Sequence, residues 1–291
     1  MIQTLTVLLI AIFYLQPRAM SYLGLNLLLN LALPIAFATL AQMCVITVND
    51  LDLGIGSFVG LVACIGATWL NETPLLGVAA LAGCIVIYAA LGALIHLRNL
   101  PSIVVTLGMS FVWLGLALLV LPTPGGKAPD WIRAIMTLKT PGLPFTIYAS
   151  IGIALVVHVA LMRSAYGAVL RGAGGNPRSV ARAGWSLLRT KVTMFALAGF
   201  FGVLSGLSLI GLTTSADANI ALRYTLLSIA GVILGGGEFV GGRISPIGAM
   251  TLTLAASFLS FLRLPPDWQI GAQGGILVLA LRALINRGEA R

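Results

Sequence analysis

The sequence predicts an all-α protein, a polytopic bundle of transmembrane helices that forms a single domain over residues 1–291. Composition is the first reason: the chain is 59% hydrophobic and 9% charged, whereas a soluble domain carries about 25% charged residues. The second reason is that the apolar residues form runs close to the roughly 20 residues of helix that cross a bilayer. The net charge of +9 lies between these runs. Basic residues in such places set membrane topology, so we expect no nucleic-acid partner.

Ten apolar runs approach this length and predict about ten membrane-spanning helices, with eight to ten as the range. In chain order they cover residues 3–16, 31–48, 53–70, 75–95, 103–121, 145–162, 192–212, 224–236, 246–261 and 270–285. Glycines recur four residues apart inside several runs, as in Gly56/Gly60 and Gly202/Gly206. This spacing lets helix backbones approach closely and predicts tight helix packing.

The longest polar interruption is residues 163–191, which we call the basic segment because it has no acidic residue. Its basic residues are Arg163, Arg171, Arg178, Arg182, Arg189 and Lys191. The positive-inside rule places it in the cytoplasm, and since six predicted spans precede it, the N-terminus is cytoplasmic too. The proline-rich loop 122–144 is then outside. The sequence therefore predicts a multi-pass membrane protein whose N-terminus and basic segment lie on the cytoplasmic side.

A short helix is predicted inside the basic segment. The Asn176 side chain can accept a hydrogen bond from a backbone N–H at a helix start, and Pro177 suits the first helical position. Gly184 can adopt the left-handed conformation that ends a helix. The helix should therefore run from Pro177 to about Ala183.

Two interpretations of this helix are open. Arg178 and Arg182 lie four residues apart and share one face, and Val180 and Trp185 offer apolar surface nearby. A stiff, capped helix of this kind is typical of a docking element. The alternative is a basic loop that only fixes membrane topology.

A second polar element, Asn49–Asp52, interrupts the otherwise apolar stretch 31–70. As one helix that stretch would be about 60 Å long, twice the thickness of a bilayer core, so the chain must turn or break here. An Asp in the hydrocarbon costs about 2.5–3.5 kcal/mol on insertion scales. We therefore expect a buried or cavity-facing structural element, with a plain surface loop as the alternative.

A third polar element follows the eighth predicted span, where five glycines flank Glu238 and the run ends at Arg243. It lacks the Gly-Lys-Ser/Thr ending of a phosphate-binding loop, and the motif G-x-x-x-x-G-K-[ST] does not occur in the sequence. We interpret it as a tight turn or re-entrant segment in which Glu238 and Arg243 pair. The sequence offers no metal-ligand cluster and no nucleophile–base pair either, so we expect neither an enzyme nor a metal site.

Four patches, in order along the chain, resemble the permease subunit of ABC importers of the ribose, xylose and galactose type. The first, Asp50–Ser57, is similar to the family's Gly-Gly-Ile-Asp-Leu-Ser-Val-Gly-Ser; the others are 105–109, 175–184 and 232–248. The resemblance implies a path or gate role for the motif residues Asp50, Asp52, Gly54, Gly56, Ser57, Thr106, Gly108, Glu238 and Arg243. The chain departs from the family pattern at Asn49-Asp50, where two glycines are usual, and at Gly54, where serine is usual.

The resemblance also implies an assembly. It implies the type II ABC importer fold, similar to the vitamin B12 permease, and a permease dimer of like or unlike chains in the lipid membrane, here the bacterial inner membrane. It implies two cytoplasmic ATPase subunits, which hold ATP and magnesium, and a periplasmic substrate-binding protein, with no cofactor in this chain itself. The patch at 175–184 is similar to the coupling helix that contacts the ATPase, through Gly175, Asn176, Pro177, Arg178, Ala181, Arg182 and Gly184.

These observations predict a permease subunit of an ATP-driven importer that forms the translocation path, with a monosaccharide as substrate. A path poor in ionised residues is consistent with a neutral sugar. One alternative is the branched-chain amino acid permease branch of the same superfamily. Another is an ion-coupled secondary transporter, which would depend on Asp50, Asp52, His158 and Glu238.

Overall fold

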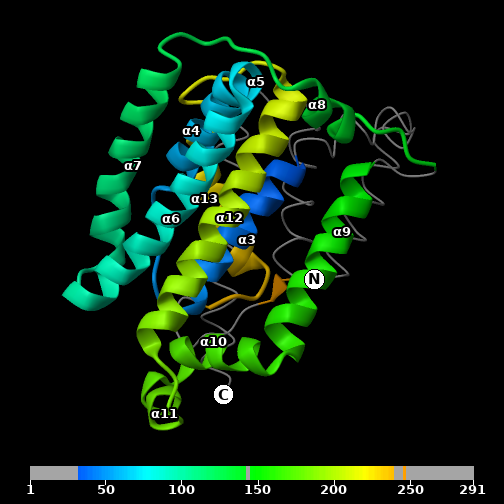
Figure 1. Cartoon of the computed structure of the whole chain (residues 1–291). Helices are drawn as coiled ribbons and strands as arrows, with labels where there is room; N and C mark the ends of the chain where they lie inside the picture. The colour runs from blue at the N-terminus through cyan, green and yellow to red at the C-terminus, as the bar shows by residue number, and fades with distance from the viewer. Residues whose placement is uncertain (1–31, 142–144, 239–244, 247–291) are drawn as a thin grey trace.

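Every regular element in the described part of the chain is a helix, which confirms the predicted all-α class (Figure 1). The computed structural model describes residues 32–141, 145–238 and 245–246. The α-helices are α3 (Ala32–Thr47), α4 (Ile55–Ala67), α5 (Trp69–Glu72), α6 (Pro74–Arg98), α7 (Ser102–Val120), α8 (Asp130–Met136), α9 (Phe145–His158), α10 (Ala165–Gly175), α11 (Pro177–Arg182), α12 (Leu187–Thr213) and α13 (Tyr224–Leu234). The π-helix η2 (Val159–Arg163) joins α9 to the turn before α10.

Five segments of the described residues are long and apolar enough to cross a membrane, and each overlaps one predicted span. They are Ile55–Glu72, Pro74–Arg98, Ser102–Val120, Phe145–Arg163 and Leu187–Thr213. Helices α3 and α13 are apolar but shorter, and they match the predicted spans 31–48 and 224–236. The predicted spans 3–16 and 270–285, and nearly all of 246–261, lie outside the described residues. The total of about ten spans therefore stays a prediction.

Helix α12 is central to the bundle and packs against α3, α4 and α6. Figure 1 shows it running the length of the molecule, with α3 alongside. Two of its glycines permit this closeness: a Cβ at Gly206 would overlap the side chain of Val62, and one at Gly202 would lie 2.6 Å from Phe58 Cε1. The four-residue glycine spacing in α12 therefore serves close packing, as predicted.

The outward faces of α6, α7 and α9 are apolar. Leu75 on α6 is 86% exposed and Leu119 on α7 is 80% exposed, and α9 exposes Ile151, Leu155 and Val156. Apolar side chains in this number are unfavourable in water but suit lipid or a neighbouring membrane subunit. The exposed faces are consistent with the membrane location that the composition predicts.

The two ends of the bundle differ. Helices α5 and α8 lie at one end, and α10 and α11 lie at the other (Figure 1). At the α5 end the loop before α8 pairs with the chain after α12: Gly125 N–H donates to Ala216 O at 2.9 Å, and Ala216 N–H donates to Gly125 O at 2.8 Å. Within loop 122–144 the described residues thus contain one short helix and a backbone bridge, which agrees with the prediction that no long helix forms there.

Candidate functional site

The predicted short helix of the basic segment forms as α11, with the predicted caps. Asn176 Oδ1 accepts a hydrogen bond from Ser179 N–H at 3.1 Å, and Pro177 occupies the first helical position. At the other end Gly184 has a φ of +83°, and Trp185 N–H donates to Val180 O at 3.2 Å. This pairing is a Schellman motif, which satisfies carbonyls left without partners at a helix end.

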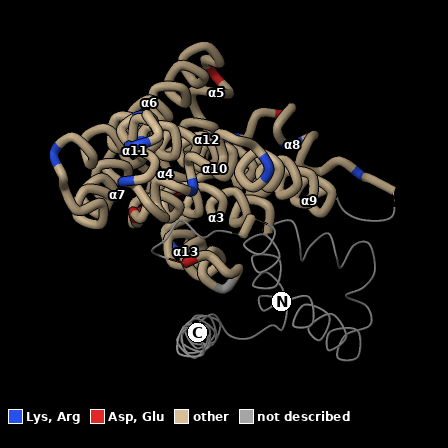
Figure 2. The backbone as a smooth tube through the Cα atoms, turned by 90° about the horizontal axis from the view of Figure 1, so that it is seen from below, with Lys and Arg blue, Asp and Glu red and all other residues tan. Residues whose placement is uncertain are grey.

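Helix α11 is held by one apolar contact and otherwise exposed. Val180 is buried and packs against α10, where its Cγ2 would lie 2.9 Å from a Cβ added at Gly172. The remaining predicted coupling residues are exposed: Gly175, Asn176, Pro177, Arg178, Ala181, Arg182 and Gly184. Figure 2 views the molecule from this end and shows Lys and Arg in blue around α10, α11 and the neighbouring helix ends.

The basic segment contains more helix than the sequence predicted. Residues 165–175 form α10, whose start is capped by the Ser164 hydroxyl, which accepts from Gly167 N–H at 2.8 Å. Helix α12 begins at Leu187 rather than at the predicted residue 192, because Ser186 caps it by accepting from Arg189 N–H at 3.3 Å. The predicted start of this span, residue 192, is therefore five residues late: Lys191 stands on α12, with its side chain 18% exposed.

The interruption between α3 and α4 is a buried polar loop, as predicted. Asp52 is 1% exposed. Its Oδ2 accepts from the Tyr88 hydroxyl at 2.7 Å and its Oδ1 from Gly54 N–H at 2.7 Å. The Tyr88 ring packs against Phe58 and Trp113, with ring centroids 4.4 Å and 6.0 Å away. The loop therefore joins α4, α6 and α7 around one carboxyl group.

Two hydroxyl groups of α7 hold the loop backbone. Ser102 Oγ accepts from Leu51 N–H, and Thr106 Oγ1 accepts from Leu53 N–H, each at 3.1 Å. The same Thr106 hydroxyl lies 3.2 Å from Leu51 O, to which it can donate. A Cβ on Gly54 would lie only 2.9 Å from Thr106 O, so glycine permits this approach.

The start of α4 is equally close to the chain before α13. Gly56 N–H donates to Thr225 Oγ1 at 3.0 Å, and a Cβ on Gly56 would lie 2.7 Å from Ala221 O. Ser57 is buried beside it. Gly108, in contrast, is exposed on α7 with no atom within 4 Å of an added Cβ. The structure thus brings Asp52, Gly54, Gly56, Ser57 and Thr106 together and leaves Gly108 apart.

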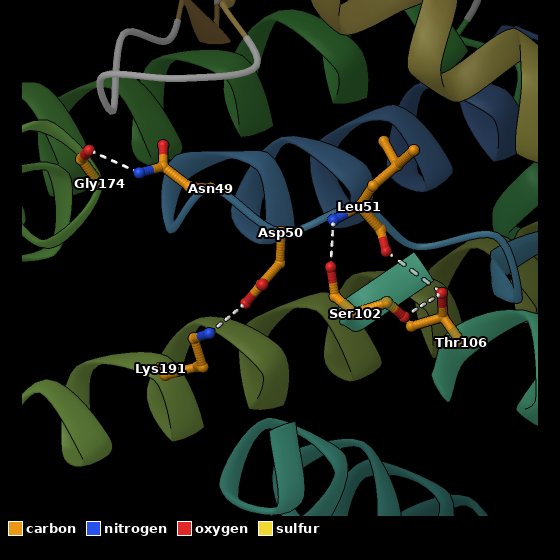
Figure 3. A network of polar contacts seen from close by, with 7 residues as sticks. All are labelled: Asn49, Asp50, Leu51, Ser102, Thr106, Gly174 and Lys191. Atoms are coloured by element: carbon orange, nitrogen blue, oxygen red, sulfur yellow. Dashed lines mark hydrogen bonds and ion pairs between the residues drawn. The ribbon is translucent and has the colours of Figure 1, made fainter. Parts of the chain in front are cut away.

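Asn49 and Asp50 join the loop to the basic segment (Figure 3). Asn49 Nδ2 donates to Gly174 O, in the last turn of α10, at 2.7 Å. Lys191 Nζ lies 2.8 Å from Asp50 Oδ2, and the two side chains are only 18% and 9% exposed. The sequence did not predict either contact, because the partners lie far away along the chain.

The glycine-rich element after α13 is described only in part. The helix ends at Leu234, and Gly236 follows with a φ of +93°, which supports the predicted tight turn. Glu238 is partly buried. Arg243 lies outside the described residues, so its pairing with Glu238 stays a prediction. Within 32–141, 145–238 and 245–246, no group of His, Cys, Asp and Glu is arranged to hold a metal ion.

Three residues of this site were missed by sequence reasoning: Gln42, Tyr88 and Trp113. When the Gln42 amide is oriented to satisfy both its polar atoms, it donates to Asp52 O at 3.0 Å and accepts from Asp52 N–H at 3.2 Å. A signal existed in the sequence, since Gln42 is the only amide in span 31–48 and Tyr88 carries the only hydroxyl in span 75–95. A lone polar group in an apolar span needs a buried partner.

The fold and this site define the class of protein: a polytopic α-helical membrane protein whose capped basic helix is tied to its buried core, as expected for a transporter subunit. The chain belongs to the permease family described as "Branched-chain amino acid transport system / permease component", whose model matches residues 24–281. This finding confirms the resemblance to binding-protein-dependent permeases. No solved structure matches the chain.

Three of its similar relatives are permeases named for sugars. The galactose/methyl galactoside import permease MglC of Haemophilus influenzae is 28% identical over 79% of this chain and 76% of its own length. The L-arabinose ABC transporter permease AraH of Azospirillum brasilense is 27% identical over 92% of this chain and 80% of its own. The ribose import permease RbsC of Haemophilus influenzae is 24% identical over 85% and 80%.

Proposed function

We propose that this chain is the membrane permease subunit of an ATP-driven ABC importer for a monosaccharide, and that α11 couples it to a separate ATPase. The family match and the sugar-named relatives support the permease role and the substrate class. The structural observation that carries the coupling role is α11 itself, a rigid helix with Arg178 and Arg182 exposed and no acidic residue.

The construction of α11 suits a helix that moves as a rigid body. Its caps stabilise both ends, so the helix should keep its shape rather than unwind at the ends when a partner displaces it. Val180 anchors it to α10, while the exposed faces are free to contact a partner. Coupling needs an element that contacts the ATPase and moves as a unit, and the exposed faces and capped ends of α11 suit both requirements.

The finer parts of the proposal follow the resemblance. They are a type II importer fold of about ten spans in a single membrane domain, a cytoplasmic N-terminus and basic segment, and a second permease chain, like or unlike. The partners are ATPase subunits, which hold ATP and magnesium, and a periplasmic substrate-binding protein. The carboxylates of the α3–α4 loop then have a structural or gating role, because the contacts of Asp50 and Asp52 are with protein groups.

The two alternatives are less well supported. A branched-chain amino acid substrate is suggested by the family's description, but the relatives quoted above are named for galactose, arabinose and ribose. An ion-coupled transporter needs carboxylates that can exchange an ion. Asp50 instead pairs with Lys191, and both oxygens of Asp52 accept hydrogen bonds, from Tyr88 and Gly54, so these carboxylates already have protein partners.

The test measures two quantities for the wild type and for each variant. One is the uptake of radiolabelled D-galactose, L-arabinose and D-ribose, and the other is the amount of ATPase that co-purifies with the tagged chain. Gly184→Val places a β-branched residue at a positive φ and should deform the end of α11. Arg182→Glu reverses a charge on its exposed face. Each variant should still insert in the membrane and should lose about fivefold or more in ATPase association, together with uptake.

Two control variants separate docking from general damage. Gly184→Asn tolerates the left-handed conformation, and Lys139→Glu reverses an exposed charge beyond α8 at the opposite end. Both should retain ATPase association. Normal uptake and normal ATPase association in Gly184→Val and Arg182→Glu would show that the basic segment only sets topology.

A further inference from the structure

The α3–α4 loop contacts the basic segment at two points that lie on either side of α11. Gly174, the partner of Asn49, precedes the N-cap Asn176 by two residues. Lys191, the partner of Asp50, follows α11 on the first turns of α12. One loop therefore holds both the chain that enters α11 and the chain that leaves it (Figure 3).

The first contact uses an unusual backbone conformation. Asn49 has a φ of +61°, in the left-handed region, where Asn is among the few tolerated non-glycine residues. This conformation lets its side-chain N–H donate to the carbonyl of Gly174 at 2.7 Å. That carbonyl belongs to the last turn of α10, where helix carbonyls have no intrahelical partner. The contact thus gives a hydrogen-bond donor to a carbonyl at the end of α10, the helix that leads into α11.

The second contact is an ion pair that is mostly withdrawn from solvent. Asp50 Oδ2 and Lys191 Nζ are 2.8 Å apart, with 9% and 18% of the side chains exposed. Ionic attraction at low exposure is screened far less than at the surface. Loss of one partner alone would leave an uncompensated charge in this position.

The loop is also bonded to the core of the bundle, through α7 and α6. Directly after Asp50, the backbone of Leu51 is held by Ser102 of α7. Asp52 is held in turn by Tyr88 of α6. Three consecutive loop residues, each with a hydrogen bond or ion pair, thus connect the basic segment to two membrane-spanning helices.

We propose that Asn49 and Asp50 are positioning residues that clamp the loop to both sides of α11 and transmit its displacement to α6 and α7. This inference rests on the proposed function, since it assigns a task to the same coupling helix. One contact would let the basic segment pivot about it. Two contacts leave only rotation about the line that joins them, so most displacements of the segment are passed on to the loop as rigid-body motion.

The test measures sugar transported per ATP hydrolysed in proteoliposomes that hold the full chain with its ATPase and binding protein. The sugar is the one that the wild type transports among D-galactose, L-arabinose and D-ribose. Asn49→Gly keeps the left-handed backbone and removes the side chain that donates to Gly174. Asp50→Asn/Lys191→Met removes the ion pair without leaving a lone charge. Each should keep the ATPase bound and lower the transport ratio by about fivefold.

A matched ion pair serves as the control. Lys127 Nζ and Asp130 Oδ1 are 3.2 Å apart at the other end of the bundle and largely exposed. Lys127→Met/Asp130→Asn should leave the transport ratio at the wild-type value. The ratio separates the clamp from a merely structural role, because a partly unfolded preparation loses transport and hydrolysis together and keeps their ratio.

The outcomes are distinguishable. A wild-type ratio in both clamp variants, with the ATPase bound, would overturn the clamp and leave the proposed function intact. A wild-type preparation in which transport needs no ATPase would overturn the proposed function and the clamp with it. If the double variant does not assemble, Asn49→Gly decides alone, because it changes no charge.

Discussion

Helix α11 and the α3–α4 loop are both polar interruptions of an apolar chain, but they are stabilised in opposite ways. The caps of α11 come from residues within five positions of the groups they satisfy, and its polar side chains are exposed. The loop's polar groups meet partners much farther along the chain: Tyr88 lies 36 positions from Asp52, and Gly174 lies 125 from Asn49.

This difference indicates which contacts stabilise each region, local ones for α11 and distant ones for the α3–α4 loop. Residues of α11 determine its shape locally, so changes there should alter a contact surface and leave the core intact. The loop depends on the whole bundle, and the bundle depends on it, because buried polar groups that lose a partner destabilise the fold. The loop should therefore be sensitive in unfolding experiments and α11 sensitive in coupling experiments.

The largest effect is expected at Asp52. Asp52→Leu leaves the Tyr88 hydroxyl and Gly54 N–H without their acceptor, at about 1–3 kcal/mol each. Asp52→Asn keeps an acceptor oxygen and should lose much less. Thermal unfolding in detergent, with the yield of monodisperse protein, measures both. If Asp52→Leu were as stable as the α11 variants, the contrast between the two regions would be wrong.

The next effect concerns the helix packing around the loop. Gly206→Ala brings a methyl group into the side chain of Val62, and such overpacking costs about 1–3 kcal/mol. Gly108→Ala has no atom within 4 Å of the new Cβ and should stabilise α7 by about 0.5–1 kcal/mol. Urea or thermal unfolding of the two variants gives the comparison. Equal losses would contradict the packing described for α12.

The smallest effect on the whole protein is expected at the cap of α11. Asn176→Ala removes the acceptor for Ser179 N–H and weakens the helix by about 1 kcal/mol. Amide hydrogen exchange should speed up in residues 177–182, while the global unfolding temperature stays the same. A fall in global stability comparable to that of Asp52→Leu would mean that α11 belongs to the core.

The same contrast explains what the sequence could predict. The start and end of α11 were predictable because the Asn-Pro start and the left-handed glycine are local signals. Hydropathy located seven apolar helices within about five residues at either end, because membrane spans need only length and composition. These predictions required no knowledge of distant contacts.

The contacts of the loop were not predictable in this way. The sequence identified Asn49-Asp50 only as a departure from the family pattern. The structure instead places both residues against the basic segment. Nothing local pairs Asp50 with Lys191, because only the fold brings α3 and α12 together. Gly108 illustrates the converse, since its motif gave it a path or gate role but its side of α7 faces away from the loop.

Helix α12 links the two ends of the bundle mechanically. Its 27 residues span about 40 Å, from Leu187 beside the basic segment to Thr213, just before Ala216, which is bridged to Gly125. If α12 moves as one body while these backbone hydrogen bonds hold its far end, its Leu187 end swings about that point. Tilting it by about 5° moves the α11 end by roughly 3.5 Å over this length. A small rotation near one membrane surface thus corresponds to a stroke of atomic size at the other.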